Sequence, residues 1–181
     1  MDNLLISTLF KVLLPSFAVA VMLIAAKKRR LSFATDIGIQ RPKSGIALAF
    51  LIGWVCLIAI EEMATSSMAG ASAKHWPDFP IHIIALRILA IGIIGPIAEE
   101  LAFRGLIMAM IRKTRLGVVG AILVAAVSWS ALHFGYSAPL LLLVLLDGIV
   151  LGSARYFSRS LWVPIGMHIT GNMFSIWQSL S

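Results

Sequence analysis

Residues 81–112 read IHIIALRILAIGIIGPIAEELAFRGLIMAMIR, an apolar run that is too long for one untilted membrane crossing. After Gly95-Pro96 near its middle, two adjacent carboxylates and an arginine interrupt it, namely Glu99, Glu100 and Arg104. A charged side chain near the bilayer centre costs at least about 2.5 to 3.5 kcal/mol on insertion scales, so this cluster indicates a functional site. On a helix Glu100 and Arg104 can pair on one face, whereas Glu99 lies about 100° around the axis and stays available for chemistry.

The rest of the chain is as apolar as this segment. The 181 residues are 60% hydrophobic with a mean hydropathy of +0.96, which excludes a soluble domain. The apolar runs have the length of membrane-crossing helices, and no stretch alternates as a barrel strand does. We therefore predict an all-α polytopic membrane protein whose residues 1–181 form a single transmembrane domain, a bundle of about six transmembrane helices. The expected segments are 4–26, 45–68, 81–112 (kinked or split at Gly95-Pro96), 117–134, 139–154 and 161–179.

The basic residues are distributed unevenly along this layout. The formal net charge is +7, and 12 of the 15 lysines and arginines fall on or toward one predicted side of the bundle. The positive-inside rule makes these loops cytoplasmic and places both termini outside the cytoplasm. Topology thus accounts for the basic composition, so we expect no nucleic-acid partner. The predicted location is the plasma membrane of a prokaryote.

Glu99 and three further polar residues, His133, His168 and Asn172, are expected near the membrane midplane. A helix rise of about 1.5 Å per residue brings them to similar depths. In a water-activating hydrolase, Glu99 would take a proton from water with the help of His133, and His168 with Asn172 would form an oxyanion hole. The same Glu99, His133 and His168 are alternatively candidates to hold a zinc ion with one open position. The sequence does not separate the two chemistries.

Two other predicted helices also contain acidic residues. Glu61-Glu62 falls near the outer end of the second helix, where we expect it to be solvated. Asp147 lies in the middle of the fifth run and needs a partner, for which Arg104 or a histidine are candidates, or else it stays protonated.

The polar residues also form an ordered set of motifs. Glu99-Glu100-x-x-Phe103-Arg104-Gly105 is followed by Trp129-x-x-x-His133, by Gly148-x-x-x-Gly152, and by Leu161-Trp162-x-Pro164-x-x-x-His168-x-x-x-Asn172. Over about residues 81–175 this combination resembles the CPBP family, the CAAX protease and bacteriocin-processing (Abi) intramembrane proteases. The motifs are specific because they occur together and in this order.

The resemblance implies a helical intramembrane endopeptidase of the type that cleaves prenylated CAAX proteins, with its catalytic core at about 81–175. It matches Glu99 and His133 to a water-activating pair, His168 and Asn172 to the oxyanion side, and Glu100 with Arg104 to a supporting pair. Members of the family are described both as metalloproteases and as metal-independent glutamate proteases, so the expected cofactor is either none or Zn. Trp129 stands where the family commonly has Phe, and we expect this substitution at a packing position to leave the chemistry unchanged.

The predicted partners are a membrane-associated peptide or protein substrate and the lipid bilayer. A non-proteolytic membrane adaptor or bacteriocin self-immunity protein of the same family is the first alternative, and it would tolerate Glu99→Gln. A small transporter that uses the buried carboxylates and histidines as a proton relay is the second, and its flux would survive His168→Ala and Asn172→Ala.

Overall fold

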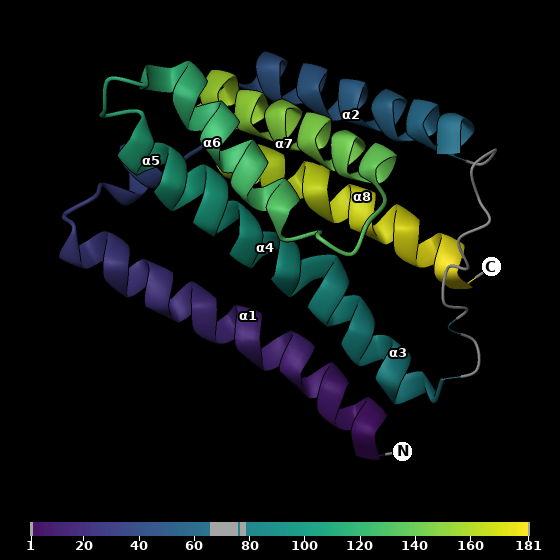
Figure 1. Ribbon diagram of the computed structural model, residues 1–181. Helices are drawn as coiled ribbons and strands as arrows, with labels where there is room; N and C mark the ends of the chain where they lie inside the picture. Colours follow the sequence, from purple (N-terminus) through teal and green to yellow (C-terminus); the bar gives the residue numbers. More distant parts are fainter. Residues whose placement is uncertain (1, 66–75, 77–78, 181) are drawn as a thin grey trace.

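The computed structural model describes residues 2–65, 76 and 79–180, and this part of the chain is helical without strands. Within these residues the long helices form a bundle of six rods, the third of which is made of α3 to α5 (Figure 1). In chain order the elements are α1 (Asp2–Lys28), η1 (Phe33–Ile37), α2 (Ser44–Thr65), α3 (Ile81–Arg87), η2 (Ile88–Ile94), α4 (Gly95–Glu100), η3 (Leu101–Ile107), α5 (Met108–Ile111), α6 (Gly117–Ala131), α7 (Ala138–Ser158) and α8 (Trp162–Leu180).

The lengths and hydropathies of the helices fit a protein that spans the membrane several times. Four helical stretches of the described chain are long and apolar enough to cross a bilayer, and α6 is a shorter apolar helix. Large apolar side chains such as Leu13, Leu14 and Phe17 of α1 are exposed, as expected for a surface that faces lipid. The predicted all-α polytopic membrane fold is therefore confirmed.

The helices run roughly parallel or antiparallel to one another, and the two chain ends lie on the same side of the bundle (Figure 1). The N-terminus and the C-terminus lie at one end of the bundle, and the connections that carry most of the basic residues lie at the other end (Figure 1). This arrangement agrees with the predicted distribution of charge along the bundle axis. Which end faces the cytoplasm stays a prediction from the positive-inside rule.

The Gly95-Pro96 pair does not split the third segment, contrary to one of the two outcomes we expected. Elements α3 to α5 run on as one helix of 31 residues, and π-helical turns stand on both sides of α4. The Gly95 N–H donates to the carbonyl of Ala90, five residues back, in the wider π-helical register. Because the helix widens at this point, it accommodates the proline ring without breaking.

Small residues bring α6 and α7 close together. A Cβ atom built on Gly148 would lie 2.9 Å from the Ala126 Cβ, and one built on Gly152 would lie 3.1 Å from the Ile122 side chain. The Gly148-x-x-x-Gly152 motif therefore faces α6 and allows the close helix packing that small residues support in membranes. Because α6 has only 15 residues, the turn that follows it lies part-way along the length of the bundle rather than at its end (Figure 1).

Candidate active site

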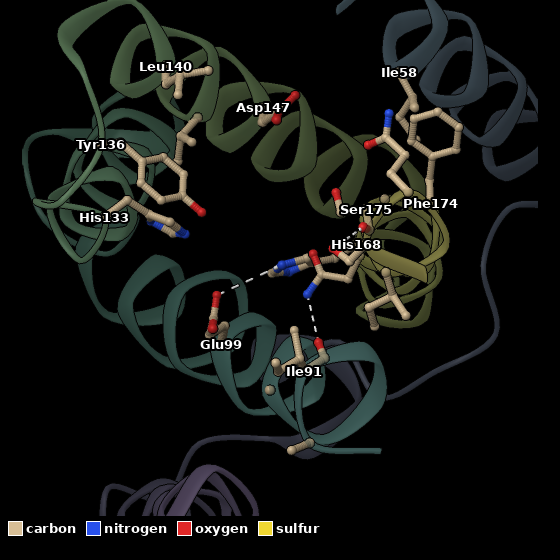
Figure 2. A pocket seen from close by; sticks show the side chains of 18 of the residues that line it. Ile58, Ile91, Glu99, His133, Tyr136, Leu140, Asp147, His168, Phe174 and Ser175 are labelled. Atoms are coloured by element: carbon tan, nitrogen blue, oxygen red, sulfur yellow. Dashed lines mark hydrogen bonds and ion pairs between the residues drawn. The ribbon is translucent and has the colours of Figure 1, made fainter. Parts of the chain in front are cut away.

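A cavity of about 970 Å³ lies between the long α3–α5 helix and helices α1, α2, α6, α7 and α8. Four of the six predicted site residues line it, namely Glu99, His133, His168 and Asn172. Figure 2 shows them projecting from three sides, with Glu99 on the long helix, His168 on α8 and His133 at the end of α6. Residues that are up to 73 positions apart in the sequence are thus brought to one space.

The two adjacent carboxylates have different environments. Glu100 is fully buried and its Oε1 lies 2.9 Å from Arg104 Nη1, one turn further along the helix. Arg104 is also fully buried and donates from Nη2 to the carbonyl of Gly148 on α7 at 3.1 Å. Its guanidinium lies 4.6 Å from the Trp129 ring centre, within cation–π range. The predicted Glu100–Arg104 pair is confirmed, and it ties the long helix to α7.

Glu99 points into the cavity, and about one-third of its side chain is exposed. The indole N–H of Trp129 donates to Glu99 Oε2 at 2.5 Å. The Nε2 atom of His168 lies 3.9 Å from the same oxygen, too far for a direct hydrogen bond. This leaves Oε1 as the carboxylate oxygen that these two groups do not occupy.

His168 stands between the two glutamates and is almost completely buried. Its Nδ1 lies 2.9 Å from Glu100 Oε1. Since the ionised carboxylate only accepts, Nδ1 carries the proton, and Nε2 is the ring atom directed at Glu99 and the cavity. The Arg104–Glu100–His168 chain therefore fixes the orientation of the imidazole.

His133 faces the cavity from the turn after α6 (Figure 2). Its Nδ1 lies 3.1 Å from the backbone carbonyl of Trp129, so in the neutral ring Nδ1 is the donor and Nε2 is an acceptor. Among the described hydrogen bonds, none joins His133 to Glu99. Both groups instead contact Trp129, whose indole N–H donates to Glu99 and whose ring centre lies 5.2 Å from that of His133.

Asn172 has a local reason for its position. The carbonyl of Ile91 lacks its usual helical donors, because the Gly95 N–H is bound to Ala90 and Pro96 has no N–H. The side-chain amide of Asn172 donates to this carbonyl at 2.8 Å. One amide hydrogen of Asn172 thus satisfies the backbone that the proline leaves open, and the second remains for another acceptor.

A family model described as Type II CAAX prenyl endopeptidase Rce1-like matches residues 81–174, just over half of the chain. The chain belongs to this family. The matched segment begins at the first residue of α3 and contains all six predicted site residues. The family resemblance is therefore confirmed, and the Rce1-like family is one of proteases. In two further comparisons, no curated protein and no solved structure matches the chain.

The donors in this Rce1-like site do not fit a zinc ion as they stand. Within the described residues, no group of three or more His, Cys, Asp or Glu side chains is arranged to hold a metal. Trp129, Glu100 and a backbone carbonyl occupy one atom each of Glu99, His168 and His133, which leaves Glu99 Oε1 and the two Nε2 atoms as possible metal ligands. These three atoms are not gathered around one point. The mechanism below accordingly uses no metal step.

Two features of the Rce1-like site were missed in the sequence. The Trp129 indole, treated as packing, is a direct hydrogen-bond partner of Glu99. Tyr136 lines the cavity with its ring 5.3 Å from that of His133, although no motif included it. Its only sequence signal is an aromatic residue three positions after a site histidine, in the same short turn.

A second carboxyl pair lines the same cavity. Glu61 of α2 and Asp147 of α7 both face it, and a hydrogen bond joins their carboxyl groups. We expected a solvated helix end at Glu61; the residue is half-buried and lines the cavity, because α2 packs against α7 and α8. The hydrogen-bond partner of Asp147 is Glu61. It is neither Arg104 nor a histidine, the partners that the sequence suggested.

Proposed function

We propose that the protein is an intramembrane endopeptidase that hydrolyses a peptide bond of a membrane-associated peptide or protein with water activated at Glu99. One observation carries the proposal. Of two adjacent carboxylates, Glu100 is fixed by Arg104 and His168, whereas Glu99 presents an oxygen to a large cavity. The membership in a protease family supports this assignment.

In the first step, Glu99 Oε1 takes a proton from a water molecule as the water oxygen bonds to the substrate carbonyl carbon. The carbonyl π bond breaks, and its electrons form an oxyanion. In this mechanism the acceptor Nε2 of His133, which also faces the cavity, receives the second water hydrogen in a hydrogen bond. The water is then held between two acceptors.

The developing negative charge requires donors. We assign two donors to the oxyanion: His168 in its protonated form, which donates from Nε2 while Nδ1 remains bound to Glu100, and the second amide hydrogen of Asn172, one turn further along α8. In the second step the proton on Glu99 passes to the amide nitrogen, the C–N bond breaks, and the carbonyl re-forms. The products are a carboxylic acid and an amine, and Glu99 is regenerated as a carboxylate.

The test is proteolysis by the purified protein in liposomes, on membrane-anchored peptides that include prenylated CAAX sequences and unprenylated leader peptides. Glu99→Gln is compared with Glu62→Gln, the same chemical change at another carboxylate of the cavity lining, on α2. We expect Glu99→Gln to lower the rate at least about 1000-fold, as loss of a general base does, and Glu62→Gln to retain it.

A chelator arm separates the two catalytic types. We expect cleavage to continue in the presence of chelator. Loss of activity that zinc restores would overturn the metal-free mechanism. A folded protein that cleaves no peptide, and whose cellular phenotype survives Glu99→Gln, would identify the non-proteolytic adaptor instead.

A further inference from the structure

We infer that Trp129 is a positioning residue for Glu99, which it holds by one carboxylate oxygen so that the other faces the substrate water. This inference rests on the proposed function and deepens it. It concerns a residue whose ring the sequence assigned to packing alone.

Trp129 is in contact with most of the candidate site. Its indole N–H donates to Glu99 Oε2, and Arg104 lies over its ring. The rings of His133 and His168 both meet it edge-on, with centroids 5.2 Å away, and its backbone carbonyl accepts from His133 Nδ1. Trp129 of α6 therefore contacts both Glu99, the proposed base, and the two site histidines.

The indole N–H is suited to this task. It is a donor only, on a rigid ring with two side-chain torsions, and at Trp129 the side chain is almost completely buried. A carboxylate on a flexible glutamate side chain otherwise samples several rotamers. A donor that binds one oxygen selects one rotamer, and the charge on the acceptor makes such a hydrogen bond stronger than a neutral one.

Phenylalanine, the residue that the family commonly has at this position, offers a ring without a donor. In this chain the ring contacts to Arg104 and the histidines would survive such a change, but the hydrogen bond to Glu99 would not. We expected tryptophan in place of phenylalanine at position 129 to leave the chemistry unchanged, and that expectation did not include the hydrogen bond to Glu99. Trp129→Phe therefore separates the packing role of the residue from its positioning role.

The chain contains a matched control. Trp54 on α2 is as buried as Trp129 and lines the same cavity, but its indole nitrogen has no hydrogen-bond partner among the described residues. Trp54→Phe removes an N–H group that binds nothing. The two variants thus make the same chemical change in one cavity and differ in the bond to Glu99.

In the peptidase assay we expect Trp129→Phe to lower kcat about 10-fold to 100-fold with KM within about 2-fold, because misplacement of a reacting group acts on the chemical step. Trp54→Phe should retain kcat. Both variants should keep a thermal midpoint within a few degrees of the wild type. Equal kcat values for the two variants, or a loss in Trp129→Phe that follows unfolding, would overturn the inference.

A spectroscopic cycle tests the contact without any substrate. A negative charge near the pyrrole nitrogen stabilises the excited indole, so Glu99→Gln should shift the tryptophan emission to shorter wavelength. The shift should vanish in the Trp129→Phe background and persist in Trp54→Phe. A wild type that cleaves nothing but shows this coupling would refute the proposed function and leave the contact standing. Absence of the coupling would overturn the positioning role even in an active peptidase.

Discussion

The Glu99–Glu100 pair and the Glu61–Asp147 pair line or adjoin the same cavity, but different partners stabilise them. In the first pair, Glu100 has the Arg104 guanidinium at 2.9 Å and the His168 imidazole at 2.9 Å. The second pair is held by a hydrogen bond between its own two carboxyl groups. Two carboxyl groups can share a hydrogen bond only if at least one of them carries a proton.

The difference shows what a buried carboxylate needs in order to remain ionised inside a membrane. Desolvation of an isolated charge is so unfavourable that the group either finds a counterion or takes a proton. Arg104 provides the counterion on the long helix, and it leaves Glu99 free to act as a base. Arg104 acts on Asp147 only through space and has its salt bridge to Glu100, so the α2–α7 pair is suited to a neutral polar contact in the cavity wall rather than to base catalysis.

The largest expected effect comes from removal of the counterion. Arg104→Met leaves Glu100 buried without its cation, and breaking a buried pair in this way costs about 3–5 kcal/mol of the free energy of unfolding. Chemical or thermal unfolding in detergent measures the loss. We also expect peptidase activity to disappear, because Arg104 no longer holds Glu100, the acceptor that orients His168.

A double variant identifies the cause of this loss. Arg104→Met combined with Glu100→Leu removes both charges, so most of the lost stability should return while activity stays absent. If the double variant is as unstable as the single one, the unpaired charge is not the reason. The contact of Arg104 with the Gly148 carbonyl would then be responsible.

A smaller effect is expected when the same carboxyl-to-amide change is made in each pair. Asp147→Asn retains a hydrogen bond to Glu61, so we expect the free energy of unfolding to change by at most about 1 kcal/mol and peptidase activity to change by less than about 3-fold. Glu100→Gln removes the charge that compensates Arg104, so it should clearly lower both the free energy of unfolding and the peptidase activity. If Asp147→Asn inactivates the protein and Glu100→Gln does not, the assignment of roles to the two pairs is reversed.

The sequence predicted the features that depend on one helix at a time. Apolar run length predicted the six segments, and the four-residue spacing of Glu100 and Arg104 predicted their salt bridge. In both cases helix geometry alone determines which groups are neighbours. Those predictions required no knowledge of how the helices pack.

The features that were missed depend on packing between helices. The Trp129–Glu99 bond joins residues 30 positions apart, and the His168–Glu100 bond joins residues 68 positions apart. Helical periodicity carries no information about which face of α6 or α8 meets the long helix. The Asn172–Ile91 bond was equally hidden, because it arises from a π-helical turn that Gly95-Pro96 signals only as a disruption.

The smallest expected effect concerns a carboxylate that belongs to neither pair and lies outside the membrane-spanning helices. A hydrogen bond from the Ser32 backbone N–H, together with Lys113 and Arg112, lowers the pKa of Asp36 from 3.8 to about 2. The Arg112 and Lys113 side chains are 34% and 55% exposed, so water screens them in a way that it cannot screen Arg104. Asp36 thus has two cationic partners, but each ion pair should contribute little to the free energy of unfolding.

We expect Asp36→Asn to lower the free energy of unfolding by about 0.5 kcal/mol at neutral pH, with a smaller effect at high salt. Because the folded-state pKa lies below the unfolded value, the contribution of Asp36 is complete above about pH 4 and is lost as the pH falls toward 2. Unfolding midpoints of wild type and variant should therefore converge over that interval. A loss as large as that of Arg104→Met would contradict the view that burial, rather than the number of ionic partners, determines how much a carboxylate pair stabilises this bundle.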